Sequence, residues 1–251
     1  MRKTAFTMPA VLMLLLALML TGCGKSVKLE YLAEPDNPVI VYYSYQAVSP
    51  VYNPGAPVAV IYGDGTRIYK KGAYQFTAGA LSGGGVAGVL GELDHLGFFG
   101  LKKRYSGQPK PGSATQTMAV YLGAGSDTSL HSVTIEAGAA PANWEEMVAA
   151  VTRAQVKGLK DYVPETLVLH ANLATETPAG TKVVEWPGNV EDLEKASEAD
   201  AKGFEIKGGQ AAIAWKALRE EATGETYWKA GDKVYTFVYA QPVFPGIKPS
   251  D

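Results

Sequence analysis

The sequence predicts an α+β fold, in which antiparallel sheets carry helices packed on one face and are built from hairpin-helix modules. Two observations predict it. Short runs of β-branched and aromatic residues are separated by glycine-containing turns, which is typical of β-hairpins. Stretches with apolar residues at helical spacing then follow two of these hairpins. With 251 residues and 47% hydrophobic composition, the chain can bury the core of one large or two small domains.

The first module is predicted to contain four strands and a helix. Residues 39–45 (VIVYYSY) form a strand, and residues 58–62 pair with residues 66–70 across a Gly-Asp-Gly turn, where glycine adopts positive φ without strain. A further strand is expected at residues 73–77. Ser82 is the predicted cap of a helix whose apolar stripe is Val86, Val89, Leu90, Leu93 and Leu96.

The second module repeats this order. Residues 115–122 and 129–136 read as two strands joined by a loose loop. Asn143 precedes Glu146 by three residues, which indicates a capping box at the start of a helix that ends near Gly158. The apolar stripe of that helix is Trp144, Met147, Val148 and Val151.

The last part of the chain has the same ingredients in a less regular order. A strand at residues 167–173 is followed by a helix that Asn189 caps and that runs through Ala199. Strands at residues 226–229 and 233–239 precede an extended, proline-containing tail, residues 242–251. A third apolar helical stripe, made of Ala211, Ala214, Trp215 and Leu218, precedes these two strands.

These elements predict the organisation of the chain. Residues 39–163 form an α+β domain of two ββα-type modules, near 39–106 and 113–163, and residues 164–251 form a C-terminal α+β part. The Pro/Gly-containing segment 108–113 between the modules is either a linker or a surface loop.

The N-terminus has the layout of an export signal. Arg2 and Lys3 precede an uninterrupted apolar run at residues 11–20, which is shorter than the about 20 residues that a transmembrane helix needs. Leu20-Thr21-Gly22-Cys23 then resembles the lipobox of bacterial lipoprotein precursors. The resemblance implies that residues 1–22 are a signal peptide and that Cys23 becomes the lipidated N-terminus. An ordinary secretory signal is the alternative.

The lipobox resemblance also implies a location. Cys23, the only cysteine of the chain, would carry a diacylglycerol and an acyl chain such as palmitate, and no other cofactor is expected. Residues 23–38 would tether the domain to an extracytoplasmic membrane face. Because Gly24 is not the aspartate that retains many lipoproteins at the inner membrane, the periplasmic face of the outer membrane is favoured in a Gram-negative host, and the cell surface otherwise.

A second resemblance covers only the first module. Residues 61–66 (IYGDGT) and residues 96–101 (LGFFGL), which lead to Tyr105, are similar to a bacterial domain of unknown function found in exported proteins. These motifs mark a turn and a helix end. The resemblance therefore implies a fold and no activity.

The sequence contains no clear signature of catalysis, metal binding or dinucleotide binding. A G-x-G-x-x-G pattern lacks the acidic residue expected about 20 positions later, where Lys102–Arg104 stand. The glycines are Gly83, Gly85 and Gly88, and the histidines, which lack metal-ligand spacing, are His95, His131 and His170. We expect a non-enzymatic protein, with an envelope hydrolase or a small-ligand carrier, whose site forms only in three dimensions, as the alternatives.

The expected partners are the membrane, through the anchor, and an envelope protein or glycan that the domain binds or scaffolds. The net charge of −2, from 23 basic and 25 acidic residues, does not favour nucleic acid. Tyr42, Tyr43 and Tyr45 are the candidate binding residues, because they are too close together for all three rings to face one way. Packing of these rings within the sheet is the alternative.

Overall fold

The structure is a computed structural model that describes residues 27–46, 55–108, 112–123, 128–199, 202–223 and 225–247. The predicted signal peptide, the lipobox and Cys23 lie outside these residues. The described part contains an eight-stranded sheet, a five-stranded sheet and four α-helices, which confirms the predicted α+β fold. None of its helices is both long enough and apolar enough to span a membrane.

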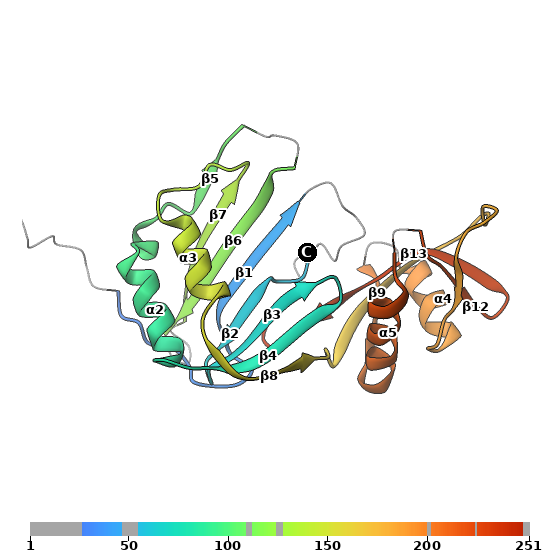
Figure 1. Cartoon of the computed structure of the whole chain (residues 1–251), viewed down its shortest axis with the longest axis horizontal. Coiled ribbons are helices and arrows are strands. Elements are labelled where there is room, and N and C mark those ends of the chain that lie inside the picture. Colours follow the sequence, from blue (N-terminus) through green and yellow to red (C-terminus); the bar gives the residue numbers. More distant parts are fainter. Residues whose placement is uncertain are drawn as a thin grey trace, which may run out of the picture.

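The eight-stranded sheet joins both predicted modules, because the first strand of one pairs along its length with the first long strand of the other (Figure 1). The strand order is β5-β7-β6-β1-β2-β3-β4-β8, and only the edge pair β5–β7 is parallel. The strands are β1 (Pro38–Gln46), β2 (Ala59–Tyr62), β3 (Thr66–Gly72), β4 (Gln75–Leu81), β5 (Arg104–Ser106), β6 (Ala114–Leu122), β7 (Ser129–Glu136) and β8 (Val156–Tyr162).

Helices α2 (Gly85–His95) and α3 (Trp144–Thr152) cover one face of this sheet, and the short helix η1 (Phe98–Gly100) follows α2 (Figure 1). Most of the predicted stripes are buried against the strands: Val86, Val89, Leu90, Leu93, Trp144, Met147 and Val151. The side chain of Gln116 joins this core to β6, because its Oε1 accepts hydrogen bonds from the Trp144 indole (2.7 Å) and the Tyr42 hydroxyl (3.0 Å).

The predicted side-chain caps of the helices were wrong. Three successive glycines with positive φ turn the chain into α2, so Ser82 lies too early to cap it and instead donates to the backbone oxygen of Gln155 at 3.2 Å. Asn143 has a φ of 60°, which is far from the extended backbone of a side-chain cap. Asn189 has extended backbone, but its side chain also makes no capping hydrogen bond.

Helix α3 was predicted to reach Gly158, but it ends at Thr152 and β8 follows. The buried Arg67 guanidinium explains the stop, because Nη1 donates to the backbone oxygens of Thr152 (3.0 Å) and Ala154 (2.7 Å). Strand β8 was not predicted, because it is an exposed edge strand that lacks an apolar face. Strand β4 also begins and ends later than predicted, because Tyr74 lies in the turn that precedes it, with a φ of 52°.

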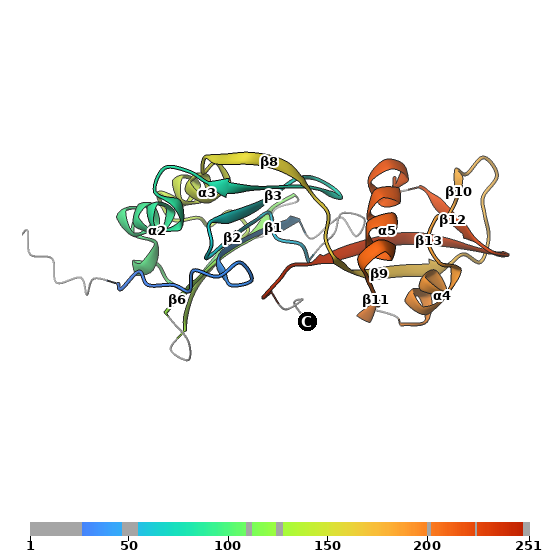
Figure 2. The ribbon, with the colours of Figure 1, turned by 90° about the horizontal axis from the view of Figure 1, so that it is seen from below.

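The C-terminal sheet has the order β10-β12-β13-β9-β11, and only the edge pair β10–β12 is parallel. Helices α4 (Val190–Glu198) and α5 (Gly208–Glu221) lie on the same face of it (Figure 2). Its strands are β9 (Thr166–Leu173), β10 (Val183–Glu185), β11 (Phe204–Lys207), β12 (Tyr227–Ala230) and β13 (Lys233–Val243). Strands β10 and β11 were not predicted, because each has only three or four residues.

The predicted extended tail begins as part of the sheet, and a turn at residues 245–246 follows. Strand β13 continues to Val243, with Pro242 opposite Leu167 of β9, and the Phe244 side chain is buried. Proline is accommodated here because β12 has already ended, so this part of β13 pairs with β9 alone.

Residues 27–37, part of the predicted tether, dock along the eight-stranded sheet. The Glu30 backbone oxygen accepts a hydrogen bond from Gly123 N at 2.6 Å, and the Asn37 oxygen accepts one from Gly63 N at 2.9 Å. Val27 and Leu29 are half-buried against the core beneath α2 and α3. The first described residue is therefore already part of the domain.

We call residues 27–162 the N-terminal lobe and residues 166–247 the C-terminal lobe. The two lobes share one hydrophobic core, because the helix-free face of the eight-stranded sheet packs against α5 and the end of β13. The Trp215 ring lies 5.3 Å from Tyr74 and 5.8 Å from Phe76, measured between ring centroids. Phe244 lies 5.4 Å from Phe76 and stacks on Tyr162 at 5.9 Å.

Candidate functional site

The three tyrosines predicted to bind do not share one surface. Tyr42 is buried beneath α3, whereas Tyr43 and Tyr45 alternate to the other face of β1. Tyr43 is half-buried, and its burial, with a smaller contribution from Tyr121, raises the pKa of its hydroxyl to about 12. Only Tyr45 is substantially exposed, at 46%. The proposed role of these residues in binding stays a prediction.

The histidines lie in three separate places. His131 packs against the rings of Phe98 and Phe99, and His170 stacks on Tyr239 with ring centroids 4.5 Å apart. His95 is the last residue of α2. In the described ranges, no group of three or more His, Cys, Asp or Glu side chains could hold a metal ion.

The glycines of the G-x-G-x-x-G pattern lie where α2 begins. Gly83 and Gly85 have positive φ, and Gly88 lies within the first turns of the helix, close to the backbone oxygen of Gly83. The preceding strand, β4, pairs antiparallel with both of its neighbours. The dinucleotide fingerprint instead requires a parallel βαβ unit, so these glycines serve the chain reversal between β4 and α2.

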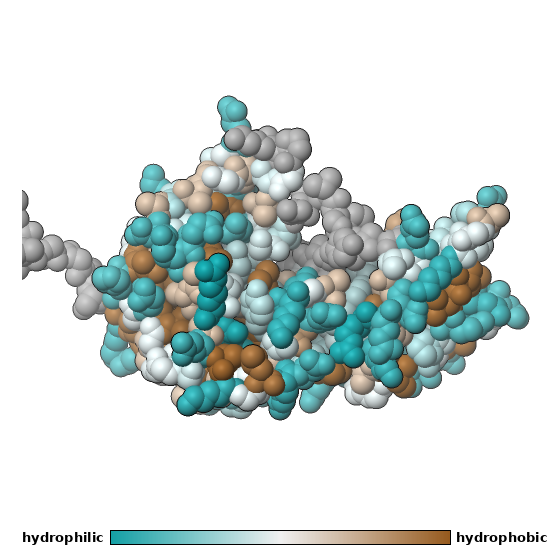
Figure 3. All heavy atoms as spheres, in the orientation of Figure 1, coloured by the Kyte–Doolittle hydropathy of each residue, from teal (hydrophilic) through white to brown (hydrophobic). Residues whose placement is uncertain are grey.

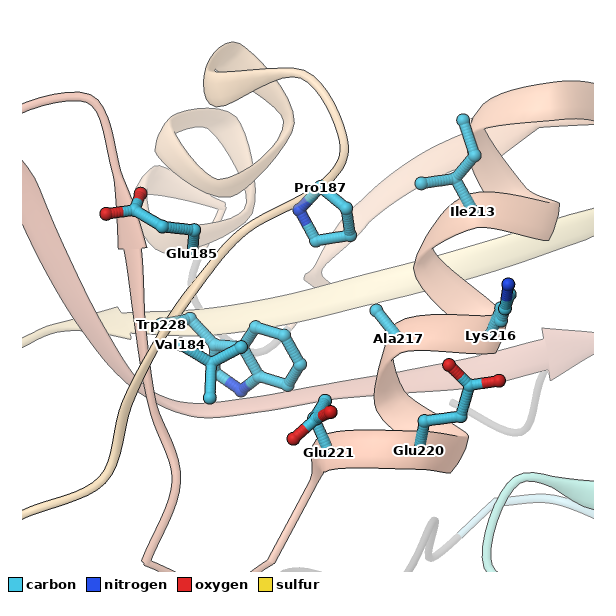
Figure 4. A pocket seen from close by; sticks show the side chains of 9 residues that line it. All are labelled: Val184, Glu185, Pro187, Ile213, Lys216, Ala217, Glu220, Glu221 and Trp228. Carbon is cyan, nitrogen blue, oxygen red and sulfur yellow. The ribbon is translucent and has the colours of Figure 1, made fainter.

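A groove in the C-terminal lobe, between α5 and β10, is the strongest candidate for a binding site (Figure 4). We call it the α5–β10 groove; its volume is about 490 Å³. The apolar part of its lining consists of Val184, Pro187, Ile213, Ala217 and Trp228. Figure 4 shows Val184 and Trp228 on the sheet side, facing Ala217 across the groove. The Trp228 ring is held in place by burial and by edge-on contact with Trp186 at 5.3 Å.

The groove lies beside a side of α5 that is distinct from its predicted core stripe. The predicted stripe of α5, which includes Trp215 and Leu218, packs into the core. Ile213 and Ala217 lie four residues apart on a neighbouring side of the helix, which faces β10 and Pro187 across the groove. Ile213 is 40% exposed, and β10 is the edge strand of the sheet, with no described strand paired on its outer side. An apolar residue outside the core stripe was the sequence signal for this site.

Positive and negative side chains are present in nearly equal number at the rim of the groove. Lys229 Nζ lies 3.0 Å from the Glu185 carboxylate, and Lys182 Nζ lies 2.7 Å from that of Glu221. Glu220 and Lys216 also line the groove and form no ion pair with a described residue. Exposed ion pairs of this kind contribute about 0–1 kcal/mol each. The visible surface of both lobes shows small apolar patches among hydrophilic side chains (Figure 3). The groove is therefore suited to an apolar group, with charge as a secondary influence.

Strand β10 presents a free backbone edge beside the groove. Tyr227 N donates to Lys182 O at 3.0 Å and Trp186 N donates to Lys229 O at 2.7 Å, so the even-numbered residues of this segment direct their backbone groups toward β12. Val183 and Glu185 therefore direct their N–H and C=O groups away from the sheet. An extended chain beside β10 can pair with these groups and place every second side chain in the groove.

Comparison with known proteins gives no precedent for this arrangement. No protein-family model, no curated protein and no solved structure matches the chain. Its function has to follow from its own residues and from the geometry of the α5–β10 groove.

Proposed function

We propose that this protein is a lipid-anchored binding protein of the bacterial cell envelope, and that its C-terminal lobe holds an extended segment of a partner protein along β10. The lipobox at residues 20–23 supports the anchor. The apolar groove beside an unpaired strand edge carries the proposal for binding.

The predicted anchor and the α5–β10 groove lie at positions that suit a tethered binding protein. The described chain begins at Val27, at the end of the N-terminal lobe that lies farthest from the C-terminal lobe (Figure 1). Val27 is four positions after Cys23, so an extended connection between them spans at most about 14 Å. An anchor at Cys23 would hold the N-terminal lobe close to the membrane and leave the α5–β10 groove at the distal end.

Strand addition at β10 would combine two interactions. Backbone hydrogen bonds to Val183 and Glu185 contribute about 0.5–1.5 kcal/mol each. An aliphatic or aromatic side chain buried between Ile213 and Trp228 contributes about 1.5–3 kcal/mol. Binding free energies of this size suit reversible binding of a partner. The side chain that enters the groove would set the specificity.

A small-ligand carrier is the second candidate. The volume of the groove, about 490 Å³, lies within the range of roughly 300–1,000 Å³ that is typical of small-molecule sites. The two candidates differ in one respect, because a small ligand has no need of the backbone groups of β10.

A photo-crosslinking experiment tests the proposal. The lipidated protein would carry p-benzoylphenylalanine in place of Ile213 and would be irradiated in its native membrane. The matched control carries it in place of Leu130, which is 56% exposed on β7 of the other lobe. We expect a discrete envelope protein to be captured from position 213 and not from position 130. Capture of no protein, or the same pattern from both positions, would contradict partner binding in the groove.

A further inference from the structure

Phe237 has a backbone conformation that is unfavourable for a large side chain. Its φ is 50°, and it lies in a bulge of β13, where the register with β9 shifts between Thr236 and Tyr239. Glycine is the usual residue at a left-handed bulge position, because a side chain with a Cβ is strained there. Phe237 is nevertheless 55% exposed to solvent.

The other described non-glycine residues with positive φ differ from Phe237. Tyr74 is 5% exposed and packs edge-on against Trp215, so burial of its ring offsets the strain. Asn143 is a residue type that tolerates the left-handed region, and Ala137 is small and lies in a turn. Phe237 therefore combines backbone strain with a large ring that the described chain does not bury. Strain of this kind is concentrated at functional sites.

The Phe237 ring forms one wall of a second cavity, of about 620 Å³, which we call the Phe237 pocket. Tyr227 of β12 supplies a second aromatic wall. Because Tyr227 and Trp228 alternate along β12, this pocket and the α5–β10 groove lie on opposite faces of the sheet. Besides Tyr227, the polar side chains that line the pocket are Thr181, Lys182, Thr223, Glu225 and Thr236.

We propose that the Phe237 pocket binds an oligosaccharide. A sugar ring has an apolar C–H face, which stacks on an exposed aromatic ring, and a rim of hydroxyl groups that both donate and accept hydrogen bonds. The aromatic rings of the pocket can stack on the C–H face of a sugar. Its hydroxyl, ammonium and carboxylate groups can form hydrogen bonds with the sugar hydroxyls. Phe237 is already exposed at the bulge, so binding needs no change of the backbone to expose the ring.

This site is independent of the proposed function. It requires neither the lipid anchor nor the free edge of β10. The two sites share no lining residue, although an ion pair links Lys182 of the pocket to Glu221 of the groove. A negative result at either site therefore leaves the other proposal intact.

The Phe237→Gly variant of the full mature chain is the sharpest test, because it removes the ring and relieves the strain together. Binding of chitotetraose, cellotetraose and maltotetraose would be measured by titration calorimetry, and binding to purified peptidoglycan sacculi by sedimentation. We expect at least one of these probes to bind the wild type, and Phe237→Gly to weaken that binding at least tenfold. The midpoint of its denaturant unfolding is expected to rise.

Leu173→Ala provides the matched control, because Leu173 is also 55% exposed and lies on the neighbouring strand β9, outside the pocket lining. Its binding should stay within twofold of the wild type. Binding of sacculi alone would assign the site to a polymeric glycan, whereas binding of a soluble tetrasaccharide would show that a short oligosaccharide suffices. The proposal is overturned if no probe binds the wild type, if Phe237→Gly binds as the wild type does, or if it unfolds at a lower denaturant concentration.

Discussion

Replacement of Trp215 by alanine is expected to lower the free energy of unfolding by about 3–5 kcal/mol, the largest effect on stability of any substitution considered. The Trp215 side chain is 2% exposed and contacts Tyr74 and Phe76 of the N-terminal lobe, although it belongs to α5 of the C-terminal lobe. Its loss would leave a cavity at the junction of the lobes. Because the lobes share this core, both should become less stable.

Denaturant unfolding of Trp215→Ala, followed by circular dichroism and by hydrogen exchange in each lobe, measures this effect. Ile213→Ala is the matched control on the same helix, and we expect it to change the free energy of unfolding by about 0.5 kcal/mol or less, because Ile213 lies on the partly exposed side of α5. Two separate transitions, with the N-terminal lobe unaffected by Trp215→Ala, would show that the lobes fold independently.

Replacement of Cys23 by serine is expected to move the protein entirely from the membrane fraction to the soluble fraction. Serine lacks the thiol that would carry the lipid, and acyl chains bind membranes with about 0.8 kcal/mol for each buried CH₂. Labelling with an alkyne fatty acid and fractionation of the cells would measure both changes. Gly24→Ala, which keeps the cysteine of the lipobox, should remain labelled and membrane-bound. A Cys23→Ser protein that still carried the fatty-acid label would contradict lipidation at this residue.

The sequence predicted the elements whose signal is local. The hairpin of β2 and β3 follows from alternating strand residues around Gly63-Asp64-Gly65, where the Asp64 carboxylate accepts from Thr66 N at 2.7 Å. Helix α5 follows from the 3.6-residue spacing of its core stripe. Helix starts were less predictable, because glycine turns and a left-handed asparagine replaced the expected side-chain caps.

The arrangement of these elements, and with it the candidate sites, could not be predicted in the same way. Pairing of β1 with β6 joins residues more than 60 positions apart, and the groove depends on β10, a three-residue strand that pairs in parallel with β12. No local pattern specifies either contact. Phe237 lies in a run that reads as a regular strand, so its positive φ became visible only in the structure.

The most direct test of the proposed function is to replace Val183 by proline and to measure capture of the partner by the crosslinker at position 213. Val183 N–H points away from β12, so proline removes a group at the free edge while the pairing of Lys182 and Trp186 with β12 remains. Val183→Thr, which keeps the N–H and the β-branched shape, is the matched control. We expect Val183→Pro to lose at least nine-tenths of the captured partner and Val183→Thr to retain it. Equal capture by the two folded variants would contradict strand addition at β10.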